Sequence, residues 1–225
     1  MSIKENLETA RKNIKEACEK VGRNPDEVTI LAVTKTIDAD RINEAVSLGL
    51  TDLGENRVQE LVSKYDLIKG DVRWHLIGHL QKNKVKYIAD KVVMIHSVES
   101  MGLCEEIERQ CAKIDKVMDI LVEVNVSGEE SKSGIAPEET ENFVKEASLF
   151  PHIRVKGLMT MAPFGAENDE LHQIFSKLHK ISVDISQKKL DNVSMECLSM
   201  GMTNDYPIAV EENSTIVRIG TGLFK

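Results

Sequence analysis

The chain has 225 residues and a formal net charge of −8, and 41% of its residues are hydrophobic against 29% charged. This composition is typical of a soluble protein with a sizeable core, and the excess of negative charge disfavours broad binding to nucleic acid or to an anionic membrane surface. Because the N-terminus carries no apolar leader and no apolar run approaches the ~20 residues that span a bilayer, we expect a cytoplasmic protein with no membrane and no nucleic acid among its partners.

Apolar runs of strand length alternate with segments of helical periodicity along the chain. Residues 3–21 predict a leading helix that ends at Gly22, and the β-branched run 28–33 is typical of a strand buried on both faces. Seven further strands are predicted near 51–54, 73–77, 92–96, 118–126, 153–160, 194–198 and 215–219, with helices between them that include 38–48, 103–114 and 169–188.

Strands that alternate with helices predict a parallel sheet. Eight βα units in 225 residues favour a single α/β domain over residues 1–225, closed as a (β/α)₈ barrel of the TIM type with an extra N-terminal helix. An open doubly wound sheet is the alternative. In a barrel, functional groups lie at the C-terminal ends of the strands, so motifs that directly follow the apolar runs are the candidates for a site.

Two polar residues follow the first two predicted strands. Lys35 ends the first strand, where a side chain points into the mouth of the barrel. Burial disfavours the ammonium form of a lysine, and the neutral amine is the form that attacks an aldehyde to make an imine. The position also suits a lysine that merely reaches solvent. Asn56 offers a donor and an acceptor, and it equally suits the N-cap of the next helix.

Two turns rich in small residues, 199–205 and 218–222, are predicted after the seventh strand and at the eighth. Successive backbone N–H groups in such turns can close on an anion, and Ser199 and Thr221 add hydroxyl donors. Phosphate sites of barrels often lie at the loops after these two strands. Either turn alone is explained by a backbone that needs glycine, whereas the two together predict a phosphate site.

His75 and His79 are candidates for a metal site because they stand four residues apart. A strand end and a glycine turn separate them, so we expect that they do not converge, and we predict no metal site.

With these segments in order, the sequence resembles the YggS/PROSC family of pyridoxal phosphate homeostasis proteins over nearly its whole length. The resemblance rests on the segments 31–36, 54–57, 75–84, 96–98, 132–134, 157–160, 199–205 and 218–221. Family members often carry Lys-Thr-Lys-Pro in the first segment, whereas this chain reads Lys35-Thr36-Ile37-Asp38, so a role for that second lysine does not carry over. Thr203 stands where serine is usual.

The resemblance implies a barrel like the N-terminal domain of alanine racemase, without the β-rich second domain of that enzyme. It implies that pyridoxal 5′-phosphate is bound covalently on Lys35 as a Schiff base and that Arg218 lies near the pyridine nitrogen. An arginine there disfavours protonation of the nitrogen and weakens the ring as an electron sink. The remaining candidate cofactor-binding residues are Ser199, Gly201, Gly220 and Thr221 around the phosphate, together with Asn56.

Two functions are then weighed. The family implies a non-catalytic role in intracellular pyridoxal phosphate homeostasis, as carrier or buffer, with pyridoxal-phosphate-dependent apoenzymes as transient partners. Because a lone barrel of this size can be monomeric, we expect a monomer. The alternative is an amino-acid racemase of low activity. Two-base racemisation needs an acid or base on each face of the reacting carbon, and Tyr65, Tyr87 and Tyr206 do not stand where racemases carry their tyrosine base. The carrier is therefore the favoured interpretation.

Overall fold

The structure is a computed structural model and describes residues 2–129 and 132–225. Helix α1 (Ile3–Val21) begins with a reciprocal cap, in which the Ser2 hydroxyl accepts the Glu5 N–H and the Glu5 carboxylate accepts the Ser2 N–H. The helix ends at Gly22, whose φ of 70° lies in the left-handed region that suits glycine. The leading helix expected over 3–21 is confirmed.

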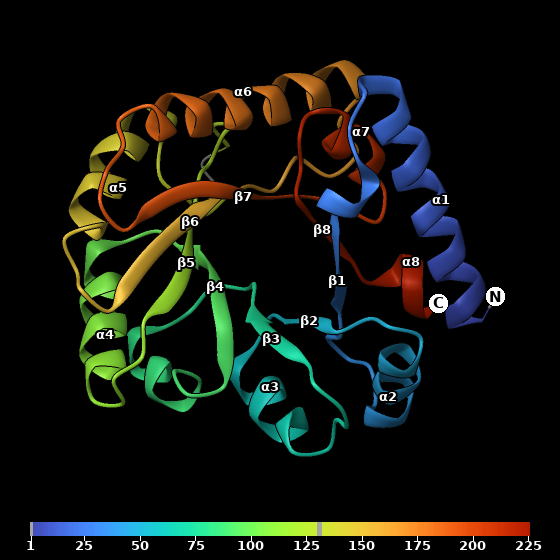
Figure 1. The fold of residues 1–225 in the computed structure, drawn as a ribbon, viewed down its shortest axis with the longest axis horizontal. Helices are drawn as coiled ribbons and strands as arrows, with labels where there is room; N and C mark the ends of the chain where they lie inside the picture. Colours follow the sequence, from blue (N-terminus) through green and yellow to red (C-terminus); the bar gives the residue numbers. More distant parts are fainter. Residues whose placement is uncertain (1, 130–131) are drawn as a thin grey trace.

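Eight parallel strands pair in chain order, and β8 pairs back with β1 to close a barrel (Figure 1). The strands are β1 (Thr29–Val33), β2 (Asp52–Glu55), β3 (Arg73–Leu76), β4 (Val92–Val98), β5 (Met118–Glu123), β6 (Ile153–Met159), β7 (Val193–Met202) and β8 (Ile216–Ile219). The predicted (β/α)₈ barrel is confirmed, and the open sheet is excluded.

The helices lie around the barrel, on the outside of the strands (Figure 1). They are α2 (Ala39–Ser47), α3 (Val58–Tyr65), α4 (Met101–Ala112), α5 (Thr140–Ala147), α6 (Asn168–Ser186), α7 (Tyr206–Glu211) and α8 (Thr221–Phe224), with short 3-10 helices η1 (Pro25–Glu27), η2 (Lys82–Tyr87) and η3 (Pro137–Glu139). Only η2 stands between β3 and β4, so that unit carries a 3-10 helix in place of an α-helix.

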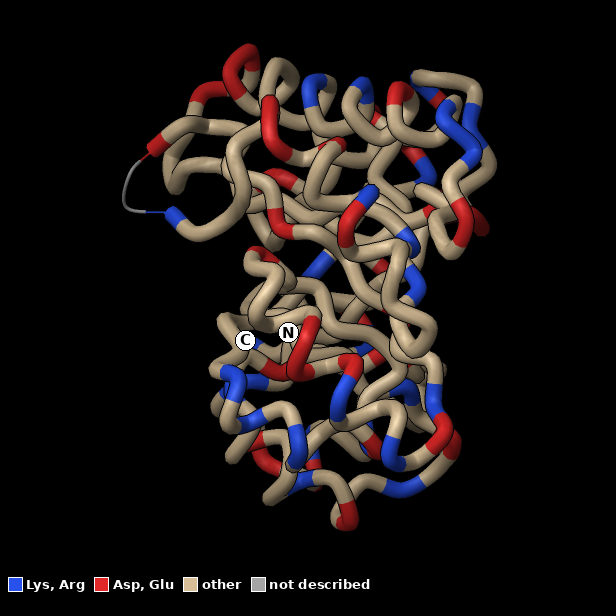
Figure 2. Tube along the Cα trace, turned by 90° about the vertical axis from the view of Figure 1, so that its left-hand side faces the viewer, with Lys and Arg blue, Asp and Glu red and all other residues tan. Residues whose placement is uncertain are grey.

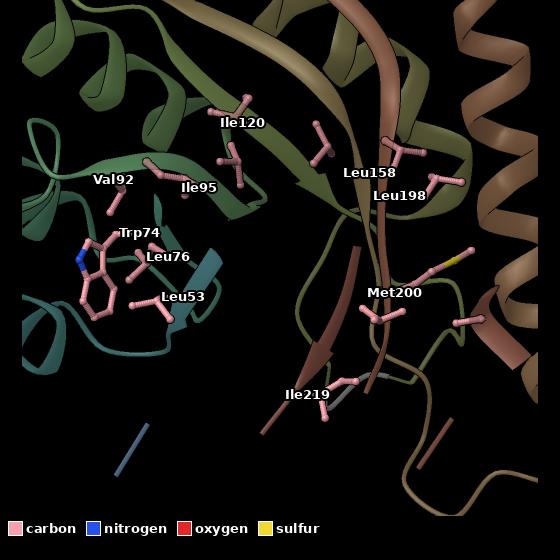
Figure 3. Packing of buried hydrophobic residues seen from close by; sticks show 14 of the residues in the cluster. Leu53, Trp74, Leu76, Val92, Ile95, Ile120, Leu158, Leu198, Met200 and Ile219 are labelled. Carbon is pink, nitrogen blue, oxygen red and sulfur yellow. The ribbon is translucent and has the colours of Figure 1, made fainter. Parts of the chain in front are cut away.

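Side chains of successive strand residues alternate between two cores. Those that point outward, such as Trp74, Ile95 and Leu158, pack in the large core between the strands and the helices (Figure 3). Those that point inward form a small apolar cluster inside the barrel, made of Leu31, Met94, Leu121, Met159 and Ile216. Other inward positions are polar, and these build the site described below.

Strand β7 extends four residues beyond its predicted end, to Met202. The segment 199–202 was predicted as a turn because it is polar and contains glycine, but it continues to pair with β8, where Met202 stands opposite Arg218. Gly201, with φ 89°, packs so closely on α7 that an added Cβ would lie 2.6 Å from the Cβ of Ala209. The turn proper therefore begins after Met202.

The two ends of the chain lie together beside the barrel (Figure 1). The Asn6 side chain on α1 donates hydrogen bonds of 3.0 Å to the carbonyls of Leu223 and Lys225, which fixes α8 and the turn at Gly220 that precedes it. Basic and acidic residues are interspersed along the chain trace (Figure 2). Among the described helices, none is long and apolar enough to cross a membrane.

Candidate functional site

Lys35 lies two residues after the end of β1, and its side chain is exposed. The burial expected from the sequence is therefore absent, because the inward-facing strand ends before this residue and the chain turns at the barrel mouth. The next residue, Thr36, has a φ of 63°, a left-handed conformation that is uncommon for a residue with a branched side chain. Its backbone N–H donates a 3.1 Å hydrogen bond to the Glu60 carboxylate on α3, which holds the turn in place.

The side chains of Thr34, Glu55 and Lys64 form hydrogen bonds that support the turn at Lys35. The Thr34 hydroxyl donates a 2.7 Å hydrogen bond to Oε1 of Glu55, at the end of β2. The Lys64 ammonium on α3 donates to the same Oε1 at 2.7 Å and to the Thr34 carbonyl at 2.8 Å. Glu55 is fully buried, and its Oε2 has no hydrogen-bond partner among the described residues. The charge of Lys64 therefore compensates a carboxylate that is only partly satisfied.

Two threonine hydroxyls meet where the chain leaves β7 and β8. The Thr221 hydroxyl donates to Oγ1 of Thr203 at 3.2 Å, and the Gly222 N–H donates to the same oxygen at 3.2 Å. Because Oγ1 of Thr203 accepts both, its own proton has no acceptor among the described residues and can be donated to a ligand. The structure thus brings Gly220 and Thr221 together with Thr203, which the sequence analysis noted only as a departure from serine and did not count as a site residue.

Ser199 lies inside the barrel, away from this pair of threonines. Its side chain is fully buried, and its Oγ accepts a 2.7 Å hydrogen bond from NH1 of Arg218. NH1 also donates to the Ser199 carbonyl at 2.7 Å, and NH2 donates to the Thr160 carbonyl at 2.9 Å. The hydroxyl of Ser199 is bound to Arg218 within the barrel, and the role expected for Ser199 beside a phosphate stays a prediction.

Arg218 is a buried cation with unused donors. Only 4% of the residue is exposed, and burial lowers the pKa of its guanidinium to about 10, although the charges of Asp205 and Glu123 act to raise it. Both NH1 protons and one NH2 proton are used, whereas the Nε–H has no hydrogen-bond partner in the described part of the chain. Arg218 can therefore donate a hydrogen bond to a ligand atom that carries a lone pair.

Two carboxylates face this cation without forming an ion pair with it among the described residues. Burial raises the pKa of Glu123 to about 7, an effect that the charge of Glu99 adds to and that of Arg218 opposes. Burial also raises the pKa of Asp205, although the Met202 N–H that it accepts and the charge of Arg218 act to lower it. Glu123 is therefore a group that changes charge near neutral pH.

A chain of buried polar groups continues from Ser199 across the barrel. The Ser199 Oγ lies 2.9 Å from Nδ1 of His96, and Nε2 of His96 lies 3.0 Å from Nδ1 of His75. Nε2 of His75 lies 3.1 Å from Oδ1 of Asp52, which also accepts from the Arg73 guanidinium. No sequence signal singled out this chain, because its members are far apart in the sequence and are joined only by barrel closure.

His75 and His79 do take separate partners, as expected. His79 lies three residues after the end of β3 and is exposed, and its Nδ1 is 3.0 Å from the Glu99 carboxylate. In the described ranges 2–129 and 132–225 there is no group of three His, Cys, Asp or Glu side chains placed to hold a metal ion.

Asn56 lies at the edge of a cleft of about 520 Å³ above β2 and β3. The residue that precedes α3 as its N-cap is Arg57, and it makes no side-chain cap, so the interpretation of Asn56 as the N-cap is wrong. The cleft is lined by Asn56, Arg57, Val58, Gln59, Glu60, His79, Gln81 and Lys84. It adjoins the Lys35 turn through Glu60, which binds Thr36.

Residues 6–225 match the family model described as alanine racemase, N-terminal domain. A pyridoxal phosphate homeostasis protein of Aquifex aeolicus is 41% identical over 225 residues, which cover 100% of this chain and 98% of the relative. The chain belongs to the pyridoxal phosphate homeostasis proteins. The resemblance drawn from the sequence motifs is thereby confirmed.

Solved structures of the family share the fold. The crystal structure of an unknown protein from Bifidobacterium adolescentis is 34% identical in sequence with a TM-score of 0.94, covering 99% of this chain and 94% of that one. The structure of PipY from Synechococcus elongatus PCC7942 with PLP bound is 30% identical with a TM-score of 0.87, covering 100% of both chains. A member of this family with the same barrel therefore binds pyridoxal phosphate.

Proposed function

We propose that this chain, as one domain over residues 1–225, binds pyridoxal 5′-phosphate covalently on Lys35 and serves its homeostasis in the cytoplasm. In this role it carries or buffers the cofactor and delivers it to apoenzymes that depend on it. The observation that carries the proposal is the placement of three groups on adjacent strands. Lys35 follows β1, Arg218 lies on β8, and Thr203 follows β7, and these strands pair with one another in the order β1, β8, β7.

The donors at this edge of the barrel fit the parts of the cofactor. The free hydroxyl proton of Thr203, with the backbone and side chain at Gly220 and Thr221, would hold the phosphate. Gly201 supports this corner through its close packing on α7. The free Nε–H of Arg218 would be donated to the pyridine nitrogen. Asn56, at the adjoining cleft, would line the side of the ring nearest β2.

Lys35 would supply the covalent link. When bound, pyridoxal phosphate brings an aldehyde. The neutral amine of Lys35 adds to the aldehyde carbon, forms a C=N bond, and releases the oxygen as water together with the two amine protons. Since Lys35 is exposed, the link can form and be hydrolysed without opening the barrel. A carrier that exchanges its cargo needs this access.

The charge of Arg218 supports a carrier over a catalyst. Since its pKa is about 10, the guanidinium keeps its proton at neutral pH and disfavours a second proton on the pyridine nitrogen. The ring is then a weak electron sink, and carbanion chemistry is poorly assisted. The Tyr206 hydroxyl, one possible second base, accepts a 2.8 Å hydrogen bond from Asn13 of α1 on the outside of the barrel. We propose that the chain acts as a monomer and without turnover.

The test compares absorbance spectra of wild type and Lys35→Ala, each titrated with pyridoxal phosphate, then reduced with borohydride and mapped by peptide mass. Lys180→Ala, an exposed lysine on α6, is the matched control. We expect a near-visible band in wild type and in Lys180→Ala that reduction fixes on residue 35, and no such band in Lys35→Ala. Equal labelling of scattered lysines in all three proteins would contradict the proposal.

The carrier role has its own measurement. Loaded protein is mixed with an apoenzyme that depends on pyridoxal phosphate, and recovery of its activity is followed beside an equal concentration of free cofactor. We expect full transfer from wild type, and none from protein whose link was first reduced by borohydride. Chiral chromatography of L-alanine incubated with the loaded protein should show no D-alanine above the level given by free pyridoxal phosphate.

A further inference from the structure

A single hydrogen-bonded chain links one end of the barrel interior to the other. It runs from Asp52 on β2 through His75 on β3, His96 on β4 and Ser199 on β7 to Arg218 on β8, with donor–acceptor distances of 3.1, 3.0, 2.9 and 2.7 Å. All five residues are buried. The chain therefore passes through the inside of the barrel, and its link from His96 to Ser199 joins β4 to β7, two strands that do not neighbour one another.

The positions of the protons along this chain follow from its two ends. Burial, together with the charge of Arg218, lowers the pKa of His96 well below its usual value, so His96 is neutral and carries one N–H. Arg218 can only donate, so Oγ of Ser199 accepts from it. The other hydrogen-bond contact of Oγ in the described chain is Nδ1 of His96, and we infer that the hydroxyl gives its proton to this nitrogen. His96 then donates from Nε2 to Nδ1 of His75, and His75 donates from Nε2 to Asp52.

The far end of the chain holds a negative charge. Burial alone would raise the pKa of Asp52, but the hydrogen bonds from His75 and Arg73 outweigh it and lower the pKa to about 2. In this order, each of the residues His75, His96 and Ser199 points its hydrogen-bond donor toward Asp52 and its acceptor toward Arg218. The opposite order would leave the Ser199 proton facing a guanidinium that can only donate, and it would place a lone pair on Nε2 of His75 against the Asp52 carboxylate.

We propose that Asp52, His75 and His96 are positioning residues for the cofactor site, which act by keeping the Ser199 hydroxyl oriented to accept from Arg218. The inference rests on the proposed function, because Arg218 matters to the cofactor only if it contacts the ring. The chain fixes NH1 of Arg218 on Ser199, and this leaves the Nε–H directed to the ligand. Apolar side chains such as Leu31 and Met94 fill the same interior, so filling space does not require the polar chain.

The proton positions are read first, without any cofactor. Nitrogen-15 NMR of the histidine rings in wild type should show His75 and His96 protonated on Nε2 and bare on Nδ1. His75→Phe removes the acceptor for His96, and we expect His96 to move its proton to Nδ1. If that variant fails to fold, Asp52→Leu removes the far acceptor and should cause the same change. His172→Phe changes a half-buried histidine on α6 that binds Glu212; it is the matched control and should change neither ring.

The effect on the cofactor site is read next, from the dissociation constant for pyridoxal phosphate. His75→Phe should raise it about three- to tenfold, the size expected for one weakened buried hydrogen bond, and His172→Phe should not. Ser199→Ala removes the link itself, so His75→Phe should add nothing further in a Ser199→Ala background.

The outcomes separate the two proposals. If His96 of wild type carries its proton on Nδ1, or if His75→Phe moves that proton but leaves the dissociation constant unchanged, the positioning role is overturned. Additive effects of His75→Phe and Ser199→Ala would overturn it as well. If wild type forms no adduct on Lys35, the proposed function fails, while the ring spectra still decide whether the chain is oriented as inferred.

Discussion

The ammonium group of Lys64 donates a 2.8 Å hydrogen bond to the backbone carbonyl of Thr34, the residue directly before Lys35. The same ammonium lies 2.7 Å from the buried Glu55 carboxylate. Helix α3 is thereby tied to the end of β1 at the point where the chain enters the left-handed turn at Thr36. The placement of Lys35 thus depends on side chains that lie outside the barrel mouth.

We predict that Lys64→Met lowers the free energy of unfolding by about 3 kcal/mol, because it leaves the Glu55 carboxylate buried without its counter-ion. Urea denaturation measures the loss. Lys69→Met, an exposed lysine in the loop after α3, should stay within about 0.5 kcal/mol of wild type. Adding Glu55→Gln to Lys64→Met should recover much of the stability, because the neutral amide no longer needs a counter-ion. A double variant as unstable as Lys64→Met alone would contradict this account.

The roles of Thr203 and Ser199 are separated by a comparison of pyridoxal phosphate with pyridoxal, which has the same ring and no phosphate. We predict that Thr203→Val weakens binding of pyridoxal phosphate about tenfold, the effect of one lost charge-assisted hydrogen bond. It should leave the affinity for pyridoxal unchanged. Ser199→Ala should weaken both ligands equally, because Ser199 acts through Arg218. A loss confined to pyridoxal phosphate in Ser199→Ala would instead place Ser199 at the phosphate.

Local sequence patterns predicted the fold because the barrel is built from repeated local units. Each buried β-branched or apolar run, such as 28–33, sets a strand, and the polar segment after it sets the return helix. The strand ends also predicted which face carries Lys35, Arg218 and Thr221. Periodicity did not predict the length of β7, since Ser199 and Gly201 read as turn residues and only pairing with β8 keeps them in the strand.

The interior of the site depended on contacts that no local pattern carries. Asp52, His75 and His96 belong to three different strands. Ser199, which bonds to His96, stands 103 positions after it along the chain. Each looked like an ordinary polar residue near a strand end. The alternation of inward and outward positions was the available signal: in β4, for example, Ile95 faces the helices, so Met94 and His96 face the barrel interior.

The close packing of β7 on α7 predicts that Gly201→Ala is costly. Its φ of 89° is unfavourable for alanine, and the new Cβ would lie 2.6 Å from the Cβ of Ala209. We expect a loss of about 2–4 kcal/mol in the free energy of unfolding. Gly165→Ala is the matched control, because its φ of 76° is equally left-handed but nothing lies within 4 Å of the added Cβ. Equal losses in the two variants would show that backbone strain alone, and not contact with α7, sets the cost.

The buried carboxyl group of Glu123 makes the free energy of unfolding fall as pH rises. Burial raises the pKa of this carboxyl from 4.5 to about 7. Between these two values the folded protein holds a proton that the unfolded chain has lost, so stability falls as pH rises through this window. Below about 4.5 both states are protonated and the penalty is absent. Above about 7 both are ionised and the penalty is complete, at most about 3 kcal/mol for a shift of this size.

We therefore predict that Glu123→Gln gains stability over wild type as pH rises from 5 to 8, because the amide carries no charge to bury. The measurement is urea unfolding at pH 5, 6, 7 and 8 for both proteins. The two should be similarly stable at pH 5, and the variant should be more stable at pH 8 by up to about 3 kcal/mol. Glu8→Gln, an exposed glutamate on α1, should follow the wild-type pH dependence. A difference between Glu123→Gln and wild type that stays constant from pH 5 to 8 would mean that Glu123 does not titrate in this range, and that its charge is already matched by Arg218.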